Sequence, residues 1–270
     1  MNIKLNDVHY YVEKRGTGFP LLLLHGFTGS STTWYPLASV LGQTSTIIMV
    51  DLLGHGKTEA PPVVERYDIL KSAADLKLLL DKLAVDKVDL LGYSMGGRLA
   101  ITFAALYPEM VRKLVLESTT PGLKTKKERE ARLQLDTKLA EKIQTDGVKT
   151  FVNYWENIPL FQTQKNLSPE KRAEIREQRL GNNATGLANS LLGMGTGSQP
   201  SWWSSLESFP FETLILAGEQ DMKFYKIGEE MLSKLPNAKF LSIKKAGHAI
   251  HVEEPEKFGT IVSGFLSNES

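Results

Sequence analysis

The sequence predicts an α/β fold, with a mostly parallel central sheet flanked by helices and a helical cap inserted between two strands. Short apolar runs alternate with helical patterns along most of the chain, which is typical of a parallel sheet covered by helices. The alternation stops near residue 119 and resumes near residue 211, and the stretch between is charged and helical in pattern. The chain has 270 residues, 41% of them hydrophobic, which is enough for one large core and a smaller subdomain.

Seven short runs, rich in apolar and β-branched residues, are the candidate strands. They are Val8–Glu13, Pro20–Leu24, Thr46–Val50, Lys87–Leu91, Lys113–Glu117, Thr213–Ala217 and Lys239–Ile243. Between Tyr67 and Ala84, apolar residues recur at intervals of three or four, which predicts a helix with one face on the sheet. The residues expected on that face are Leu70, Ala73, Leu76, Leu80 and Leu83.

The segment between the fifth and sixth of these strands has no strand pattern but contains the helical stretches Lys126–Gln144 and Pro169–Leu180. Because strands resume at Thr213, we expect this segment to cover the strand ends at which open α/β sheets bind ligands. The predicted organisation is a core of residues 1–118 and 211–270 with a helical cap of residues 119–210.

The charge balance limits the classes of partner. Lys and Arg total 32 and Asp and Glu total 31, so the formal charge of +1 creates no long-range attraction to nucleic acid or anionic lipid. The chain has no cysteine, and His9, His25 and His55 lack metal-ligand spacing, so we expect no disulfide, metal or cofactor. The start lacks a signal-peptide pattern and Pro20–Leu24 is too short to cross a bilayer, which predicts a cytoplasmic protein without a membrane partner. The sequence does not indicate an oligomeric partner.

Gly92-Tyr93-Ser94-Met95-Gly96 matches the pattern G-x-S-x-G and lies between a buried strand pattern and the helix-forming run Met95–Leu106. The two glycines let the chain turn sharply, so that the serine oxygen points outward beside a helix N-terminus. Backbone N–H groups at such a terminus can stabilise an oxyanion. The motif and its context predict that Ser94 is a catalytic residue.

A serine hydroxyl needs an imidazole partner, and the imidazole needs a carboxylate to hold its tautomer and orientation. Asp221 follows the strand Thr213–Ala217, and His248 follows the strand Lys239–Ile243 after Ala246-Gly247, so both lie at strand exits. The chain order serine, acid, histidine favours a Ser94–Asp221–His248 triad. Glu117 and Glu219 are alternative acids, and His251 is the alternative base.

His25-Gly26-Phe27 directly follows a run of leucines, at a strand exit where a glycine lets the backbone approach a ligand. We expect the backbone N–H groups of Phe27 and Met95 to form an oxyanion hole, and the His25 ring to be structural.

Arg98 lies one helical turn after Ser94, where it could meet an anionic substrate, although an ordinary ion pair explains it equally well.

With the serine elbow, His25-Gly26-Phe27, Asp51-Leu52-Leu53-Gly54-His55-Gly56, Asp221 and His248 in register, the chain resembles the α/β-hydrolase superfamily over nearly its full length. Further motifs resemble a family of menaquinone-pathway lyases. They are Gly92 to Arg98, Thr120-Pro121-Gly122-Leu123, Tyr154-Trp155 with Pro159 and Phe161, Gly186-Leu187-Ala188-Asn189-Ser190, and Gly193-Met194-Gly195-Thr196-Gly197. The chain departs from that family at Leu133, near which a second basic residue is usual, and at Leu192, where an arginine is frequent.

The resemblance implies a carbon–oxygen lyase without a cofactor. The triad would remove a ring proton from 2-succinyl-5-enolpyruvyl-6-hydroxy-3-cyclohexene-1-carboxylate, and pyruvate would leave by elimination. It implies that Arg98 and Arg132 bind carboxylates of this small polycarboxylate substrate and that Tyr93 and Trp155 line the pocket. Two alternatives use the same residues: a serine hydrolase that cleaves an ester or a carbon–carbon bond, and a non-catalytic binding protein on this fold.

Overall fold

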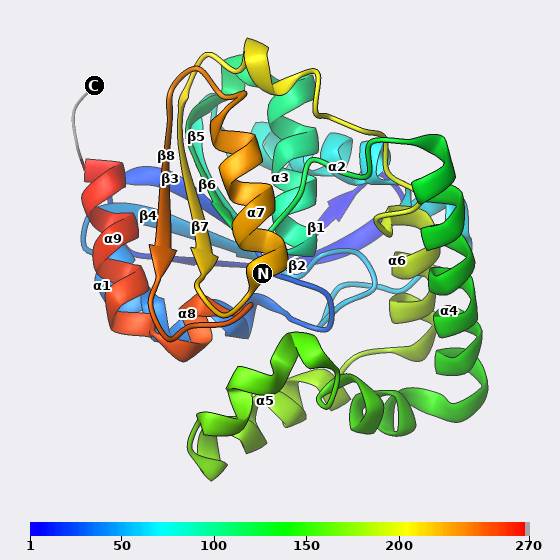
Figure 1. Ribbon diagram of the computed structural model, residues 1–270. Coiled ribbons are helices and arrows are strands. Elements are labelled where there is room, and N and C mark those ends of the chain that lie inside the picture. Colours follow the sequence, from blue (N-terminus) through cyan, green and yellow to red (C-terminus); the bar gives the residue numbers. More distant parts are fainter. Residues whose placement is uncertain (268–270) are drawn as a thin grey trace.

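A computed structural model describes residues 1–267 as an eight-stranded sheet covered by helices on both faces (Figure 1). The strands are β1 (Asn2–Leu5), β2 (Val8–Arg15), β3 (Phe19–Leu24), β4 (Ser45–Val50), β5 (Val88–Tyr93), β6 (Val111–Glu117), β7 (Glu212–Gly218) and β8 (Ala238–Ile243). Their order across the sheet is β1-β2-β4-β3-β5-β6-β7-β8. The six strands from β4 to β8 in this order are parallel, whereas β1 and β2 pair antiparallel at one edge. The predicted α/β class with a mostly parallel sheet is confirmed.

Each of the seven predicted strands is present, and most extend one or two residues beyond the predicted bounds. Strand β1 was not predicted. The central strands are buried along their length, because helices cover both faces of a parallel sheet and apolar residues are needed on each. This burial explains why these strands read as continuous apolar runs rather than as alternating patterns.

Helices α2 (Ile69–Lys82), α3 (Met95–Leu106) and α7 (Met222–Leu232) pack in one apolar core, on one face of the sheet. Helices α1 (Ala38–Leu41) and α9 (Pro255–Ser267) share a second core on the opposite face. The prediction for Leu70 is wrong: this side chain is 41% exposed, and Ile69 lies in the core instead. The side chain of Asp68 accepts bonds from the first N–H groups of α2, so the helix begins at Ile69 and its buried face falls on Ile69, Ala73, Leu76 and Leu80.

The segment between β6 and β7 holds α4 (Lys126–Trp155), the 3₁₀ helix η4 (Pro159–Asn166), α5 (Pro169–Leu180) and α6 (Ala184–Met194). The predicted stretch Pro169–Leu180 is confirmed. Lys126–Gln144 is helical too, and beyond a kink at Gly147, with a non-helical φ of 78°, a second helical stretch runs to Trp155. Thr125 and Glu128 form a capping box that fixes the start of α4.

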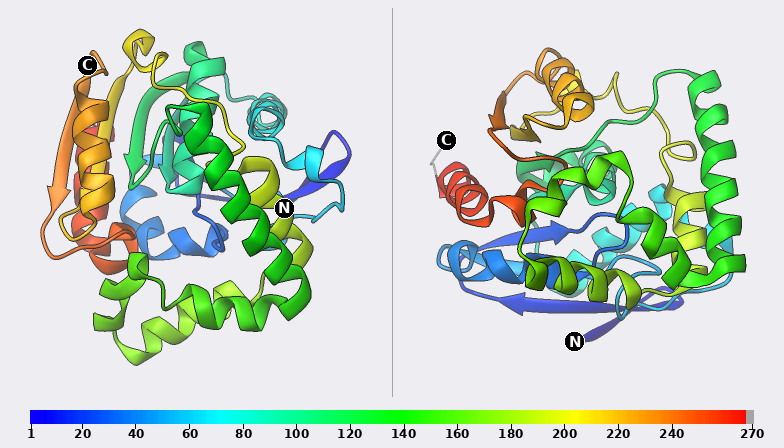
Figure 2. Two further views of the ribbon diagram at one scale, coloured as in Figure 1. Left: turned by 45° about the vertical axis from the view of Figure 1, so that its right-hand side comes forward. Right: turned by 60° about the horizontal axis from the view of Figure 1, so that its bottom comes forward.

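This segment has its own apolar core around Ile143, Phe151 and Leu187. In both figures it lies beyond the carboxyl ends of the parallel strands, and the arrowheads of β7 and β8 point toward α5 (Figures 1 and 2). The placement is that of a cap over the strand ends, although the division into residues 1–118, 119–210 and 211–270 stays a prediction and the last three residues lie outside the described part. Within residues 1–267, no helix combines the length and the apolar composition needed to cross a membrane.

Candidate active site

Ser94 stands at the sharp turn between β5 and α3. Its backbone has φ 50° and ψ −106°, a conformation that a residue with a side chain adopts only when its surroundings enforce it. The close approach of Gly92 to Gly96 and of Gly96 to the Leu24 carbonyl enforces it, because a Cβ at either glycine would lie within 2.5 Å of a backbone oxygen. Ser94 precedes the first helical residue, yet its hydroxyl makes no capping bond to α3. The hydroxyl is therefore available to a partner outside the helix.

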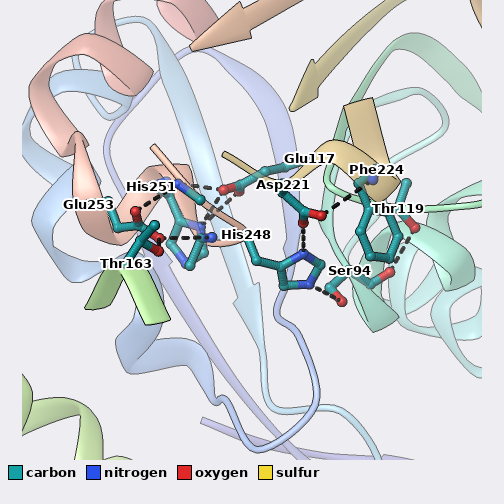
Figure 3. Close-up of polar contacts among 11 residues, drawn as sticks. Ser94, Glu117, Thr119, Thr163, Asp221, Phe224, His248, His251 and Glu253 are labelled. Atoms are coloured by element: carbon teal, nitrogen blue, oxygen red, sulfur yellow. Dashed lines mark hydrogen bonds and ion pairs between the residues drawn. The ribbon is translucent and has the colours of Figure 1, made fainter. Parts of the chain in front are cut away.

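The structure brings Ser94, His248 and Asp221 together in one chain of hydrogen bonds (Figure 3). The distance from His248 Nε2 to Ser94 Oγ is 3.0 Å, and that from His248 Nδ1 to Asp221 Oδ2 is 2.6 Å. Because the carboxylate only accepts, Nδ1 carries a proton and Nε2 of a neutral ring can accept the serine proton. Asp221 also accepts a bond from the Phe224 N–H at the start of α7, which fixes its carboxylate.

The alternative acid and base form a separate buried pair. His251 Nδ1 lies 2.8 Å from Glu117 Oε2, and the His251 N–H also bonds to this carboxylate. Figure 3 shows this pair beside the chain that leads to Ser94. Glu219 is exposed, and its N–H bonds to the Ile243 carbonyl. The histidine that contacts Ser94 in this geometry is His248, and its acid partner is Asp221.

The loop that carries His248 is held by one carboxylate. Glu253 accepts bonds from the N–H of Gly247 at 2.8 Å and of Ala249 at 3.3 Å, the two residues that flank His248. It also accepts a bond of 3.0 Å from the Thr163 hydroxyl in η4, so a residue of the cap segment reaches the same group (Figure 3). Burial raises the pKa of Glu253, and these bonds act against the rise because they favour the charged form.

The predicted oxyanion donors, Phe27 and Met95, line the same cavity as Ser94 and His248. Met95 is the first residue of α3, so its N–H has no carbonyl partner within the helix. The loop of Phe27 is fixed by the buried His25 ring, whose Nδ1 donates to the Gly26 carbonyl and whose Nε2 accepts from the Leu52 N–H. His25 is therefore structural, as the sequence predicts.

Acid should destabilise the protein through His25 and His55. Burial lowers the pKa of His25 to about 4 and that of His55 to about 3, so both rings stay neutral in the folded chain while the unfolded chain takes up protons near pH 6.5. Their contribution to stability is complete above pH 6.5 and is lost as the pH falls toward these values, by about 2 kcal/mol for His25 alone at pH 5. Urea unfolding at pH 7 and pH 5 measures the loss. A His25→Gln variant with the same pH dependence as the parent would contradict it.

A cavity of about 180 Å³ opens above Ser94, and the predicted residues Tyr93, Arg98, Arg132 and Trp155 all line it. Arg98 is buried, and its guanidinium donates to the Met194 carbonyl and, at 2.6 Å, to Gln199 Oε1. These acceptors are neutral, so the intrahelical or surface ion pair considered from the sequence is absent at Arg98 within residues 1–267. Burial lowers the pKa of Arg98 to about 10, which leaves it charged at neutral pH.

Arg132 is paired with the buried Asp136, with 2.8 Å between Nε and Oδ1. A third cation, Lys223, also lines the cavity, together with other residues to which the sequence analysis gave no role. These are Thr119, Thr120, Leu123, Leu160, Phe161, Ser190, Leu191, Gly195, Thr196, Phe224 and Ile227.

A larger cavity of about 340 Å³ lies between the end of α4, η4 and α5, but Ser94 and His248 do not line it. We therefore place the site in the smaller one.

Residues 20–255 match the model of the family described as alpha/beta hydrolase fold. The chain is 50% identical, over 99% of its length and 98% of the relative's, to a putative 2-succinyl-6-hydroxy-2,4-cyclohexadiene-1-carboxylate synthase of Bacillus subtilis (strain 168). The chain belongs to the α/β-hydrolase fold family and, within it, to this synthase family. A second synthase, from Photorhabdus laumondii, is 30% identical over 92% of the chain and 85% of that protein.

Solved structures of the α/β-hydrolase fold superpose on nearly the whole chain. The structure of MenH from S. aureus has a TM-score of 0.91 and 36% identity, and the match covers 96% of this chain and 97% of that one. A thermophilic esterase from Thermogutta terrifontis, solved with malate bound, has a TM-score of 0.85 and 28% identity over 98% of this chain and 97% of that one. The family thus includes relatives with different reactions on one scaffold.

Proposed function

We propose that this chain is a lyase of menaquinone biosynthesis that eliminates pyruvate from 2-succinyl-5-enolpyruvyl-6-hydroxy-3-cyclohexene-1-carboxylate, giving 2-succinyl-6-hydroxy-2,4-cyclohexadiene-1-carboxylate. The observation that carries the proposal is the Ser94–His248–Asp221 chain at the base of a cavity lined by three cations. Identity to the synthases over nearly the full chain supports the reaction. The substrate carries three carboxylates, which matches the cations of the cavity.

The reaction begins at the ring carbon that carries the succinyl group. Its proton is acidified by the adjacent succinyl carbonyl, and its removal places charge on that carbonyl oxygen. Ser94 Oγ accepts this proton as its own moves to His248 Nε2, and Asp221 stabilises the imidazolium that forms. The N–H groups of Phe27 and Met95 stabilise the developing enolate oxygen.

The electron pair left by the proton completes the elimination. It forms a double bond between ring carbons 2 and 3. The double bond between carbons 3 and 4 then shifts to carbons 4 and 5, and the bond from carbon 5 to the enolpyruvyl oxygen breaks. The departing enolpyruvate takes up one proton and becomes pyruvate, His248 gives up one proton and returns to the neutral ring, and the six-membered ring keeps the 2,4-diene of the product. No acyl-serine forms along this route, so Ser94 serves as a proton carrier.

The cations bind and orient the substrate. Arg98 offers a planar fork of donors at the floor of the cavity, and Arg132 adds a second guanidinium, each suited to a carboxylate. Tyr93 and Trp155 supply apolar walls. We place the reaction in the cytoplasm, because its substrate is a polyanion that dissolves in water.

The test is pyruvate release by the purified protein from the enolpyruvyl substrate, followed through lactate dehydrogenase and NADH. We expect stoichiometric pyruvate and a product with the absorbance of a conjugated diene. The esterase similarity makes serine hydrolysis the second candidate, and aryl esters are its probe. Rapid aryl ester cleavage without pyruvate release would replace the lyase with a hydrolase, and binding of the substrate without either reaction would indicate a non-catalytic protein.

A further inference from the structure

The cavity above Ser94 holds more positive charge than its own carboxylates balance. Arg98, Arg132 and Lys223 all line it. Among the described residues, the one ion pair that these three make with a carboxylate is that of Arg132 with Asp136. Arg98 bonds to neutral oxygens, and Lys223 contacts the face of the Phe224 ring at 5.2 Å. Two positive charges therefore face the cavity without a bound counterion.

These cations are close enough to affect one another. Burial lowers the pKa of both Arg98 and Lys223, and the charge on Arg132 lowers each of them further. The carboxylates of Asp136 and Asp221 act in the opposite direction, on Arg98 and Lys223 respectively. Like charges placed together in a partly buried cavity destabilise it until an anion is bound. A ligand with several negative charges would relieve this repulsion.

Lys223 occupies the mouth of this cavity, and Arg98 its floor. Lys223 is exposed as a residue, with its ammonium partly shielded from solvent at the cavity, whereas Arg98 is buried. The Phe224 ring links Lys223 to the base, because its centroid is 4.7 Å from that of His248 and the lysine ammonium also lies over this ring. Lys223 is also two residues from Asp221, on the first turn of α7, so its backbone is fixed by the helix that carries the triad acid.

We propose that Lys223 is a substrate-positioning residue that binds one of the three carboxylates of the substrate at the mouth of the cavity, while Arg98 and Arg132 bind the other two. The inference rests on the proposed function for the identity of the substrate. It assigns a third cation of the cavity to the third carboxylate. The ring proton then faces Ser94 in one orientation.

The experiment compares steady-state pyruvate release by the parent, Lys223→Gln and Lys223→Arg. We expect kcat/KM to fall about 10- to 100-fold in Lys223→Gln, mainly through a higher KM, because a charge-assisted bond to the substrate is lost. Lys223→Arg should recover most of the loss, since it restores the charge. The KM of the parent should rise more steeply with ionic strength than the KM of Lys223→Gln.

The matched control is Lys226→Gln, which removes a lysine from the next turn of the same helix, exposed and outside the cavity lining. It should leave KM unchanged. A Lys223→Gln protein with the KM and salt dependence of the parent would overturn the proposal, and so would a loss that Lys223→Arg fails to recover.

A binding arm separates this inference from the proposed function. Calorimetry with propane-1,2,3-tricarboxylate measures affinity for a three-carboxylate ligand without any turnover. We expect weaker binding to Lys223→Gln than to the parent and to Lys226→Gln. If the parent releases no pyruvate but this difference is found, the carboxylate subsite stands and the reaction is wrong; equal affinity in all three proteins rejects the subsite even if pyruvate is released.

Discussion

Ser94→Ala should lower kcat for pyruvate release by about 100- to 10,000-fold, the range for loss of a positioned proton-transfer group. The alanine removes the oxygen that bonds to His248 Nε2 and that would receive the ring proton. KM should change little, because the carboxylate-binding cations remain. Single-turnover measurement of pyruvate, at saturating substrate, tests the effect on the chemical step.

A control for this variant is Ser233→Ala, which removes an exposed hydroxyl at the end of α7 that bonds to the Glu230 carbonyl. Its kcat should equal that of the parent. Pyruvate release by Ser94→Ala at the parent rate would remove Ser94 from the mechanism and leave the triad geometry without a catalytic role in this reaction.

Arg98→Met should raise KM by about 100-fold, the second largest effect, because one side chain with several donors is lost from the floor of the cavity. Methionine fills a similar volume without charge. The change also leaves the Met194 carbonyl and Gln199 Oε1 without their donor, so the folded state should lose about 1 to 3 kcal/mol of stability. Kinetics below the unfolding range, with a parallel denaturant curve, separate the two effects.

Arg98→Lys distinguishes the shape of the guanidinium from its charge. Lysine keeps the positive charge but cannot present two parallel N–H groups, so we expect KM between those of the parent and Arg98→Met. A KM unchanged in Arg98→Met would show that this residue serves the packing of Met194 and Gln199 rather than the substrate.

The sheet could be predicted because its central strands are buried on both faces. Runs such as Pro20–Leu24 and Thr213–Ala217 are apolar without interruption, and only a covered parallel sheet needs such strands. The position of Ser94 could be predicted for a related reason. Its turn requires glycine at 92 and 96, so the geometry leaves a pattern in the sequence.

Other features could not be read from local sequence. Strand β1 is four residues long and only one of them is buried, so its pattern is too short to detect. The exposure of Leu70 depends on where α2 begins, and this is decided by the Asp68 side chain rather than by apolar spacing. The helical stretch that ends α4 at Trp155 follows a break at Gly147, whose backbone is not helical, so it is a second helix that the pattern of Lys126–Gln144 does not reach.

The sequence likewise predicts some residues of the candidate site and not others. Asp221 and His248 follow strands, so chain order places them. Lys223 lines the cavity because α7 begins directly after the triad acid, and this start depends on the capping bond from the Phe224 N–H to Asp221. The sequence predicts a helix near Lys223, but it does not show which side chain at the start of that helix faces the cavity. The His251–Glu117 pair joins residues 134 apart, a contact that only the assembled sheet creates.

The three bonds that converge on Glu253 mean that substitutions in the cap can impair the base from a distance. Thr163 shares Glu253 with the peptides on either side of His248, so losing its hydroxyl would leave Oε1 of that carboxylate with only the longer bond from the Ala249 N–H. A variant in which the cap is replaced to admit other substrates should therefore keep a hydroxyl at position 163. Without this hydroxyl, we expect the variant to bind its new ligand but to have a low kcat.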